Sequence, residues 1–324
     1  MDIAPASSAR PTRSVPAWLR TATRPAAYLG VARELAVGAW STATYPLGLG
    51  RGGAAEGRAP SEGDAAPPLA QRSRLAADPE TALLPVLLVH GWFHNRSAFL
   101  VMARALRAAG FHNVVPVGYD MLRHDMTALV GLLAVDVERA LEQSGAQRCM
   151  LVGHSLGGLV ARAYVQDHGG EDTVDTVVTI GTPHAGTRTS LLGPGSSARA
   201  MRPGSTFLRD LDRTARPGPV RWVAYSSDLD AFIRPTANAR LTNPALQATN
   251  LVVRDAGHLS LLVSPTVVRG VIGWLSDRSA SRPEPLAGVT QLPTPAQRSR
   301  RAFGAALEAA EAVPPATRSL SEPG

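Results

Sequence analysis

The chain has 324 residues, of which 44% are hydrophobic, and a net charge of +7. This length suits one α/β enzyme domain with extensions or two average domains. The one cysteine, Cys149, excludes an internal disulfide framework and a cysteine-cluster metal site. All 33 basic residues are arginine, and they are spread along the chain without a basic stripe or interleaved aromatic residues. This pattern argues against a nucleic-acid partner.

The first 25 residues are rich in Pro, Ser, Thr and Arg, and they contain no apolar run long enough for a signal-peptide core. We therefore expect a cytoplasmic or peripheral membrane location, with secretion as the alternative. A helix is expected over about 26–45, ended by Pro46.

One side of this expected helix is apolar and includes Tyr28, Val31, Leu35 and Ala39, with Leu29 and Trp40 adjacent. Arg33 and Glu34 in its middle argue against a transmembrane span, because a charged side chain is costly at the centre of a bilayer. Two interpretations remain. The preferred one is that the helix docks its apolar side on the main domain, and the alternative is that residues 26–49 contact a lipid surface.

The composition of the chain divides it into three parts. Residues 50–80 combine Gly, Ala, Pro and charged residues without periodicity, which is typical of a linker, so residues 1–80 form an N-terminal extension. Residues 279–324 repeat this composition and are expected to be a disordered tail. The flexible extensions leave 81–278 as the part that can build a core.

Apolar strand-like runs alternate with helical patterns in this central part. The expected strands are Val86–Val89, Val114–Val117, Cys149–Val152, Val174–Ile180, Val220–Tyr225 and Thr249–Val253. The expected helices are Ser97–Ala109, Met126–Gln143, Leu156–Asp167 and Pro265–Ser276. This rhythm predicts an α/β fold with a mostly parallel sheet of about six strands and helices on both faces.

The strongest local motif is G-x-S-x-G, with Ser155 between Gly153 and Gly157. A buried strand precedes it and a helix follows, which predicts a tight turn that places the serine at positive φ. Small residues two places before and after the serine avoid a clash there, and Gly158 lets the helix approach the sheet closely. Ser155 is therefore the candidate nucleophile.

A serine hydroxyl needs a general base, and the base needs a carboxylate that holds its tautomer. His258 follows the last expected strand, on a loop at the carboxyl edge of the sheet, where open α/β sheets build their sites. Asp228 and Asp230 both follow the strand that ends at Tyr225. We prefer Asp230 as the acid, and Asp228 remains the alternative.

A reaction that passes through an oxyanion also needs N–H donors. One donor is expected to be the backbone N–H of Leu156, the residue after the nucleophile. The other is expected on the loop after Val86–Val89, where we assign the backbone N–H of Trp92. His90 in the same loop is interpreted as a structural hydrogen-bonding residue and not as a proton carrier.

Five segments, VLLVHGWF, VGHSLGGLVARAYV, VVTIGTPHAGT, AYSSDLDAFIRP and AGHLSLL, together resemble bacterial lipases and carboxylesterases of the α/β-hydrolase superfamily. The resemblance is greatest to small actinobacterial and Bacillus-type triacylglycerol lipases, and it covers about 84–275. It implies an α/β-hydrolase fold with Ser155, Asp230 and His258 as a catalytic triad and Trp92 and Leu156 as oxyanion donors.

Residues 182–218 carry apolar side chains, among them Leu191, Leu192 and Phe207, and allow two interpretations. The segment is either a short cap that forms the wall of an acyl groove or an ordinary surface excursion. His184 has no ligand set around it at a recognisable spacing, so we expect neither a metal nor a cofactor.

The expected function is hydrolysis of carboxylic esters of lipids through an acyl-enzyme. An acyltransferase or a thioesterase with the same triad is the alternative, because the same groups serve water or an alcohol as the acceptor. A non-catalytic binding protein on the same fold is less favoured, since all the catalytic parts are present.

Overall fold

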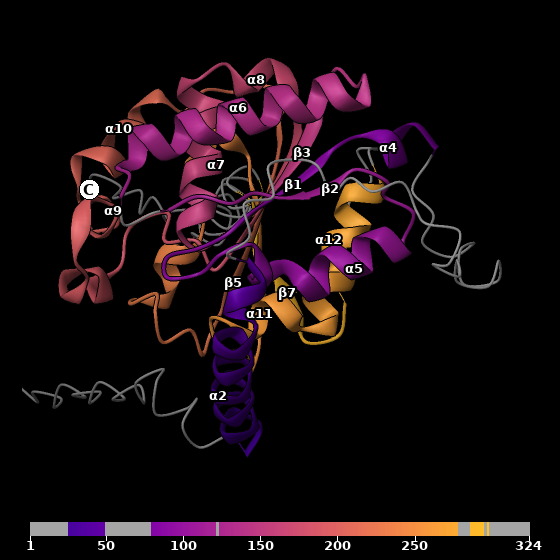
Figure 1. Ribbon diagram of the computed structural model, residues 1–324. Helices are drawn as coiled ribbons and strands as arrows, with labels where there is room; N and C mark the ends of the chain where they lie inside the picture. The colour runs from indigo at the N-terminus through magenta and orange to yellow at the C-terminus, as the bar shows by residue number, and fades with distance from the viewer. Residues whose placement is uncertain (1–24, 49–78, 121–122, 278–285, 295–296, 298–324) are drawn as a thin grey trace, which may run out of the picture.

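The computed structural model describes residues 25–48, 79–120, 123–277, 286–294 and 297 (Figure 1). The first 24 residues, most of the expected linker and most of the expected tail lie outside this description. Within the described residues, seven strands form one sheet in the order β2-β1-β3-β4-β5-β6-β7. All neighbouring pairs are parallel except β6 and β7, which are antiparallel.

All six expected strands are present, and a seventh follows them. The strands are β1 Val86–Val89, β2 Val114–Pro116, β3 Cys149–His154, β4 Val174–Ile180, β5 Arg221–Ser227, β6 Thr249–Val253 and β7 Val289–Gln291.

The expectation of a disordered tail was wrong for 286–294, because β7 pairs with the free edge of β6. Backbone bonds from Arg254 N to Gly288 O and from Leu292 N to Asn250 O extend this pairing. Three residues are too few for the alternation of apolar and polar side chains that identifies a strand.

The expected helices are present with small changes at their ends. The α-helices are α2 Pro25–Thr44, α4 Pro79–Leu83, α5 Leu100–Ala108, α6 Met126–Ser144, α7 Leu156–Asp167, α8 Gly170–Thr173, α9 Gly195–Ala200, α10 Thr206–Thr214, α11 Ser260–Val263 and α12 Pro265–Ser276. Short 3₁₀ turns are η1 Tyr45–Gly48, η2 Arg96–Phe99, η3 Arg188–Leu192, η4 Thr236–Ala239 and η5 Pro244–Leu246.

Helices cover both faces of the sheet, with α6 and α7 on one face and α5 and α12 on the other (Figure 1). Successive side chains of a strand point to opposite faces, so β1 contributes to both cores. Leu87 and Val89 pack in the core beneath α6 and α7, whereas Val86 and Leu88 pack in the core beneath α5 and α12. This arrangement explains why the strands are continuous apolar runs.

The first turn of α7 lies very close to the sheet because it begins with glycines. A Cβ on Gly157 would lie 2.1 Å from the backbone oxygen of Val89 at the end of β1. A Cβ on Gly158 would lie 1.9 Å from Oγ1 of Thr182, just after β4. The close approach expected for Gly158 is therefore observed, and it fixes the height of α7 above the carboxyl edge of the sheet.

Helix α2 is present where it was expected, and it projects from the domain beside α11 (Figure 1). Apart from Glu34, its inward side is made of small residues, and a Cβ on Gly30 would lie 2.7 Å from the backbone oxygen of Asp255. The large apolar side chains of Tyr28, Leu29 and Leu35 are each about 70% exposed.

The preferred interpretation of α2 was therefore wrong about the docking face, although the helix does dock on the domain. At Gly30 its backbone lies so close to the loop after β6 that no larger side chain fits between them. Among the described helices, α2 included, none combines the length and the apolar character needed to cross a membrane.

We predict opposite stability effects for alanine at two helical glycines. Gly157→Ala would place a Cβ against backbone and should lower the free energy of unfolding by about 2 kcal/mol or more. Gly131→Ala in α6 meets no atom within 4 Å and should raise it by about 0.5–1 kcal/mol, because alanine loses less backbone entropy in a helix. Urea denaturation measures both, and equal effects would contradict the close packing of α7.

Candidate active site

Ser155 occupies the sharp turn between β3 and α7, with φ 53° and ψ −121°. Its backbone N–H donates to Ile180 O at the end of β4, at 2.9 Å. A Cβ on Gly153 would lie 2.5 Å from the Cα of Gly158, so the turn closes only around glycine. The positive φ that the sequence predicts for Ser155 is thus present, and it is a strained conformation for a residue other than glycine.

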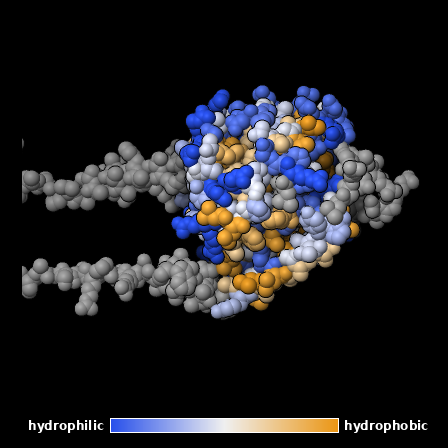
Figure 2. All heavy atoms as spheres, turned by 60° about the vertical axis from the view of Figure 1, so that its left-hand side comes forward, coloured by the Kyte–Doolittle hydropathy of each residue, from blue (hydrophilic) through white to orange (hydrophobic). Residues whose placement is uncertain are grey.

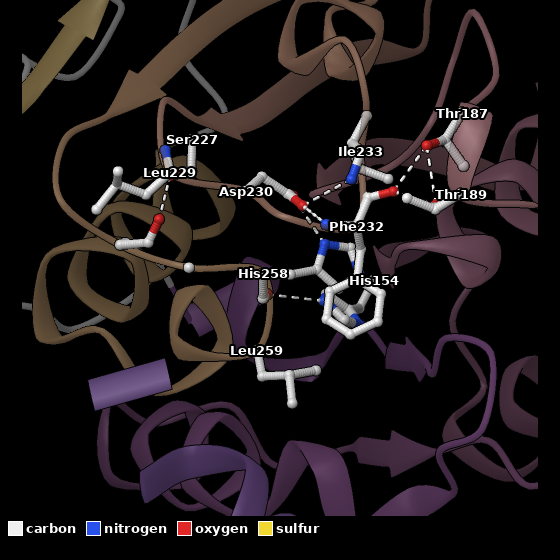
Figure 3. A network of polar contacts seen from close by, with 12 residues as sticks. His154, Thr187, Thr189, Ser227, Leu229, Asp230, Phe232, Ile233, His258 and Leu259 are labelled. Atoms are coloured by element: carbon white, nitrogen blue, oxygen red, sulfur yellow. Dashed lines mark hydrogen bonds and ion pairs between the residues drawn. The ribbon is translucent and has the colours of Figure 1, made fainter. Parts of the chain in front are cut away.

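Asp230 and His258 come from the loops after β5 and β6 and meet beside this turn (Figure 3). The Nδ1 atom of His258 lies 2.7 Å from Oδ2 of Asp230, and both side chains are buried. The other carboxylate oxygen accepts the backbone N–H groups of Phe232 and Ile233, each at 2.8 Å. Three donors therefore fix the Asp230 carboxylate.

Asp228, the alternative to Asp230 in the sequence analysis, has a different contact. Asp228 Oδ1 accepts the backbone N–H of Asp255 at 3.0 Å, which ties the loop after β5 to the loop after β6. Asp230 is therefore the carboxylate in contact with His258, while Asp228 connects the two loops that carry them.

The loop of His258 is joined directly to the turn of Ser155. The Nε2 atom of His154 donates to the backbone oxygen of His258 at 3.2 Å, and the two rings lie 4.6 Å apart between centroids. The ring of Phe232 lies 5.1 Å from the His258 ring (Figure 3). Because His154 immediately precedes Ser155, this bond holds the loop of His258 against the turn that carries Ser155.

The pKa of His258 is governed by opposing influences. Burial by itself lowers it, but the charge of Asp230, its hydrogen bond to Nδ1 and the charge of Glu34 together raise the pKa above the ordinary value of 6.5. His258 is therefore a stronger base than an unperturbed imidazole.

Other histidines near the turn are held in the neutral form. Burial lowers the pKa of His90 to about 4 and that of His94 to about 4, the latter assisted by His258. Burial also lowers the pKa of His154 well below its ordinary value. Of these four rings, His258 is the one with a carboxylate partner and a raised pKa.

The loop after β1 reaches Ser155, the candidate nucleophile. The N–H of His94 donates to Gly91 O at 3.3 Å, and Phe93 has φ 58°, so Trp92 and Phe93 form the centre of a tight turn. A Cβ on Gly91 would lie 2.8 Å from the Cβ of Ser155. The oxyanion roles of the Trp92 and Leu156 N–H groups stay predictions.

His90 has the surroundings of a structural residue. Its ring stacks on Tyr119 with centroids 4.2 Å apart, and its Nδ1 lies 3.0 Å from Gly91 O. The hydroxyl of Tyr119 donates to the backbone oxygen of His90. These contacts fix the loop that carries Trp92.

The two interpretations of 182–218 apply to different parts of the segment. Side chains from its second half are buried in the core beneath α6 and α7: Met201, Leu208 and Leu211. In contrast, Leu192 of η3 is 92% exposed, and a Cβ on Gly193 would lie 2.0 Å from the Trp92 ring. Thus α10 packs on the core as an ordinary surface excursion would, whereas η3 borders the loop that carries Trp92.

Two threonines of this segment also fix the loop that carries Asp230. The hydroxyls of Thr187 and Thr189 donate to Phe232 O at 2.7 and 2.5 Å (Figure 3). His184 is buried, and its Nε2 lies 3.0 Å from Oγ1 of Thr179, so it is a hydrogen-bonding residue of the interior. In the described part of the chain, no three His, Cys, Asp or Glu side chains are grouped as a metal site.

Some residues of the site were not found from the sequence. The rings of His154 and Phe232 flank His258, and Glu34 from α2 accepts two backbone N–H groups just after it. A signal for Glu34 was available, because it shares helical spacing with Gly30 and Gly38 in a helix whose one other charged residue is Arg33.

The arrangement of strands and helices is that of the α/β-hydrolase fold. The mature form of the Bacillus licheniformis lipase BlEst2 has the same fold, with a TM-score of 0.52 and 18% identity, over 62% of this chain and 94% of the lipase. Aspergillus fumigatus lipase B matches with a TM-score of 0.51 and 17% identity, over 61% of this chain and 55% of that protein.

Sequence comparisons match parts of the chain to a thioesterase family and to a lipase. The profile of the palmitoyl protein thioesterase family matches 85–211. An sn-1-specific diacylglycerol lipase, ABHD11 of Xenopus laevis, is 32% identical over 80 residues, which is 24% of this chain and 26% of the relative. The chain thus spans about a quarter of that relative. This chain resembles bacterial lipases and esterases of the α/β-hydrolase superfamily and shares their fold.

We predict that the two aspartates differ in their effect on His258. Asp230→Asn removes the charge that raises the pKa of His258, so this pKa should fall. Asp228→Asn keeps the oxygen that accepts the Asp255 N–H and should leave it unchanged. NMR titration of the His258 ring, assigned with His258→Ala, measures both. A lower pKa in Asp228→Asn alone would show that the acid is assigned to the wrong residue.

Proposed function

We propose that the chain is a serine hydrolase that cleaves carboxylic esters of lipids. The observation that carries the proposal is the position of Ser155 at positive φ on the β3–α7 turn, with the loop of His258 bonded to that turn and His258 bonded to Asp230. A strained turn supported in this way exposes a nucleophile at the carboxyl edge of the sheet.

The proposed reaction has two halves. Oγ of Ser155 attacks the ester carbonyl carbon while Nε2 of His258 accepts the hydroxyl proton, and this proton then passes to the departing alkoxide to give an alcohol and an acyl-enzyme. Water then attacks the acyl carbon, again losing a proton to His258, which returns it to Ser155 as the carboxylic acid leaves. The N–H groups of Trp92 and Leu156 stabilise the oxyanion of each tetrahedral intermediate.

A lipid ester is supported as the substrate by the apolar surroundings of the site. Phe232 beside His258 is half exposed, as is Phe93 beside Trp92. Leu192, nearly fully exposed on η3, adds a third large apolar side chain near the loop of Trp92. Such side chains favour an acyl chain over a polar substituent.

Thioester hydrolysis is the second candidate, and the match to the palmitoyl protein thioesterase profile favours it. The same triad serves both reactions, because a thiolate leaves from the same tetrahedral intermediate as an alkoxide. Relative turnover of an oxyester and a thioester with the same acyl chain separates the two candidates. A competing alcohol in the same assay detects acyl transfer.

We further propose that α2 contacts the lipid surface that supplies the substrate. Its outward side presents Tyr28, Leu29, Val31 and Leu35, and the helix contacts α11, which follows His258. Figure 2 shows apolar atoms gathered on the lower part of one face, at the height where α2 projects in Figure 1. An apolar surface next to the catalytic loops would bring the site to the lipid.

Ser155→Ala should lower the turnover of p-nitrophenyl esters by about 10⁴-fold or more, because the nucleophile is lost while the fold remains. A series of acyl chain lengths on the wild type should show higher kcat/KM for longer chains, as the apolar surroundings predict. Asp228→Asn serves as the matched control and should keep most of the activity. Unchanged turnover in Ser155→Ala would overturn the proposed mechanism.

The lipid-contact proposal is tested with the double variant Leu29→Ser, Leu35→Ser. Binding to phosphatidylcholine vesicles should fall, because each serine removes exposed apolar surface. Turnover of a short soluble ester and the melting temperature should stay unchanged. The control is Leu132→Ser, an exposed leucine on α6 far from α2 (Figure 1). Equal vesicle binding by the double variant and the wild type would refute the proposed contact.

A further inference from the structure

The carboxylate of Glu34 lies against the loop that carries His258. Oε1 accepts the backbone N–H of Leu259 at 2.7 Å, and Oε2 accepts that of Ser260 at 2.8 Å. These two residues directly follow His258, whereas Glu34 lies more than 200 residues earlier, in α2. Both bonds are charge-assisted, which makes them stronger than bonds between neutral groups.

The position of this carboxylate leaves little freedom for the loop. A Cβ on Gly257 would lie 2.3 Å from Oε2 of Glu34, so the residue before His258 also touches the carboxylate. The N–H of Gly257 donates to Oγ of Ser260 at 2.7 Å, which closes the loop on itself. The N–H groups of Leu259 and Ser260 lie at the start of α11, where a helix has no partner of its own for them.

The same N-terminal segment also contacts the loop that follows β1. Nδ2 of Asn95 donates to the backbone oxygen of Tyr45 in η1 at 2.8 Å. Oδ1 of Asn95 accepts the backbone N–H and the hydroxyl of Ser97, so Asn95 is the N-cap of η2. The loop that carries Trp92 ends at this asparagine. Residues 25–48 therefore support two of the loops that build the site.

We propose that Glu34 is a positioning residue for His258, holding the loop 257–260 through the backbone N–H groups of Leu259 and Ser260. Its expected effect on turnover rests on the proposed function, whereas its effect on His258 does not. In this role α2 helps to position His258, although the helix lies outside the segment that resembles known hydrolases.

The charged and titratable groups around His258 come from four elements. Asp230 faces it from the loop after β5, His154 from β3, His94 from the loop after β1 and Glu34 from α2. The two histidines are neutral at pH 7 because burial lowers their pKa values. The negative charge near His258 therefore comes from Asp230 and Glu34, and both act to raise its pKa.

The direct test is Glu34→Gln, with Arg33→Gln on the exposed side of the same helix as the control. Glutamine keeps the length of the side chain but has no charge and one acceptor oxygen. The acid limb of the pH–rate profile should move to lower pH, since His258 then becomes neutral at lower pH. A loosened loop should lower kcat by about tenfold, with little change in KM, because misplacement of a base affects the reaction more than binding.

A second measurement does not depend on turnover. NMR titration of His258 should give a lower pKa in Glu34→Gln than in the wild type and no change in Arg33→Gln. A wild type without esterase activity would refute the proposed function, and this titration would still decide the role of Glu34. Unchanged His258 pKa and unchanged kcat in Glu34→Gln would overturn the role of Glu34 itself.

A variant that keeps the charge tests the geometry if Glu34→Gln does not fold. Glu34→Asp withdraws the carboxylate by one methylene, so its bonds to the Leu259 and Ser260 N–H groups should be lost. It should lower kcat and move the pKa of His258 in the same direction as the glutamine variant. Wild-type values of both quantities in a folded Glu34→Asp would contradict the proposal.

Discussion

The strained backbone of Ser155 is the constraint on which the site depends. A serine at φ 53° persists only where the surrounding packing fixes it, and here the packing is backbone against backbone. Gly153 meets Gly158 across the turn, and Gly157 meets the end of β1. The same contacts set the height of α7 and bring the turn beside the ends of β1 and β4. One local conformation thus connects the sheet, the helix and the candidate nucleophile.

Burial and charge give the histidines near this turn different pKa values. A buried imidazole without a charged partner is held neutral and weakly basic, as His90, His94 and His154 are. His258 is equally buried, but the Asp230 carboxylate at 2.7 Å and the charge of Glu34 together more than offset the loss of hydration and raise its pKa. The fold therefore raises the pKa of one of several similar rings, and the Asp230 carboxylate that contributes to this is itself fixed by two backbone N–H groups.

Much of this arrangement could be predicted from the sequence, because it follows from local rules. The strand–turn–helix pattern around Ser155 predicted its backbone conformation, and chain order placed His258 at the same edge of the sheet. The sequence could not decide between Asp228 and Asp230, because both lie on the same short loop and only the geometry of that loop determines which one reaches His258. The role of Glu34 was not predicted, because it depends on a contact between residues more than 200 positions apart. The docking face of α2 was missed because the large apolar side chains on its other side gave the stronger sequence pattern. Strand β7 was too short to show a period.

If Ser155 carries the acyl group during turnover, mass spectrometry of the acid-quenched enzyme will detect it there. The wild type is mixed with a p-nitrophenyl ester, quenched within the first turnover and digested with a protease. We expect the acyl mass on the peptide that contains Ser155, and we expect His258→Ala to slow its appearance. Ester hydrolysis without this adduct, or with the acyl group on another residue, would show that Ser155 is not the nucleophile.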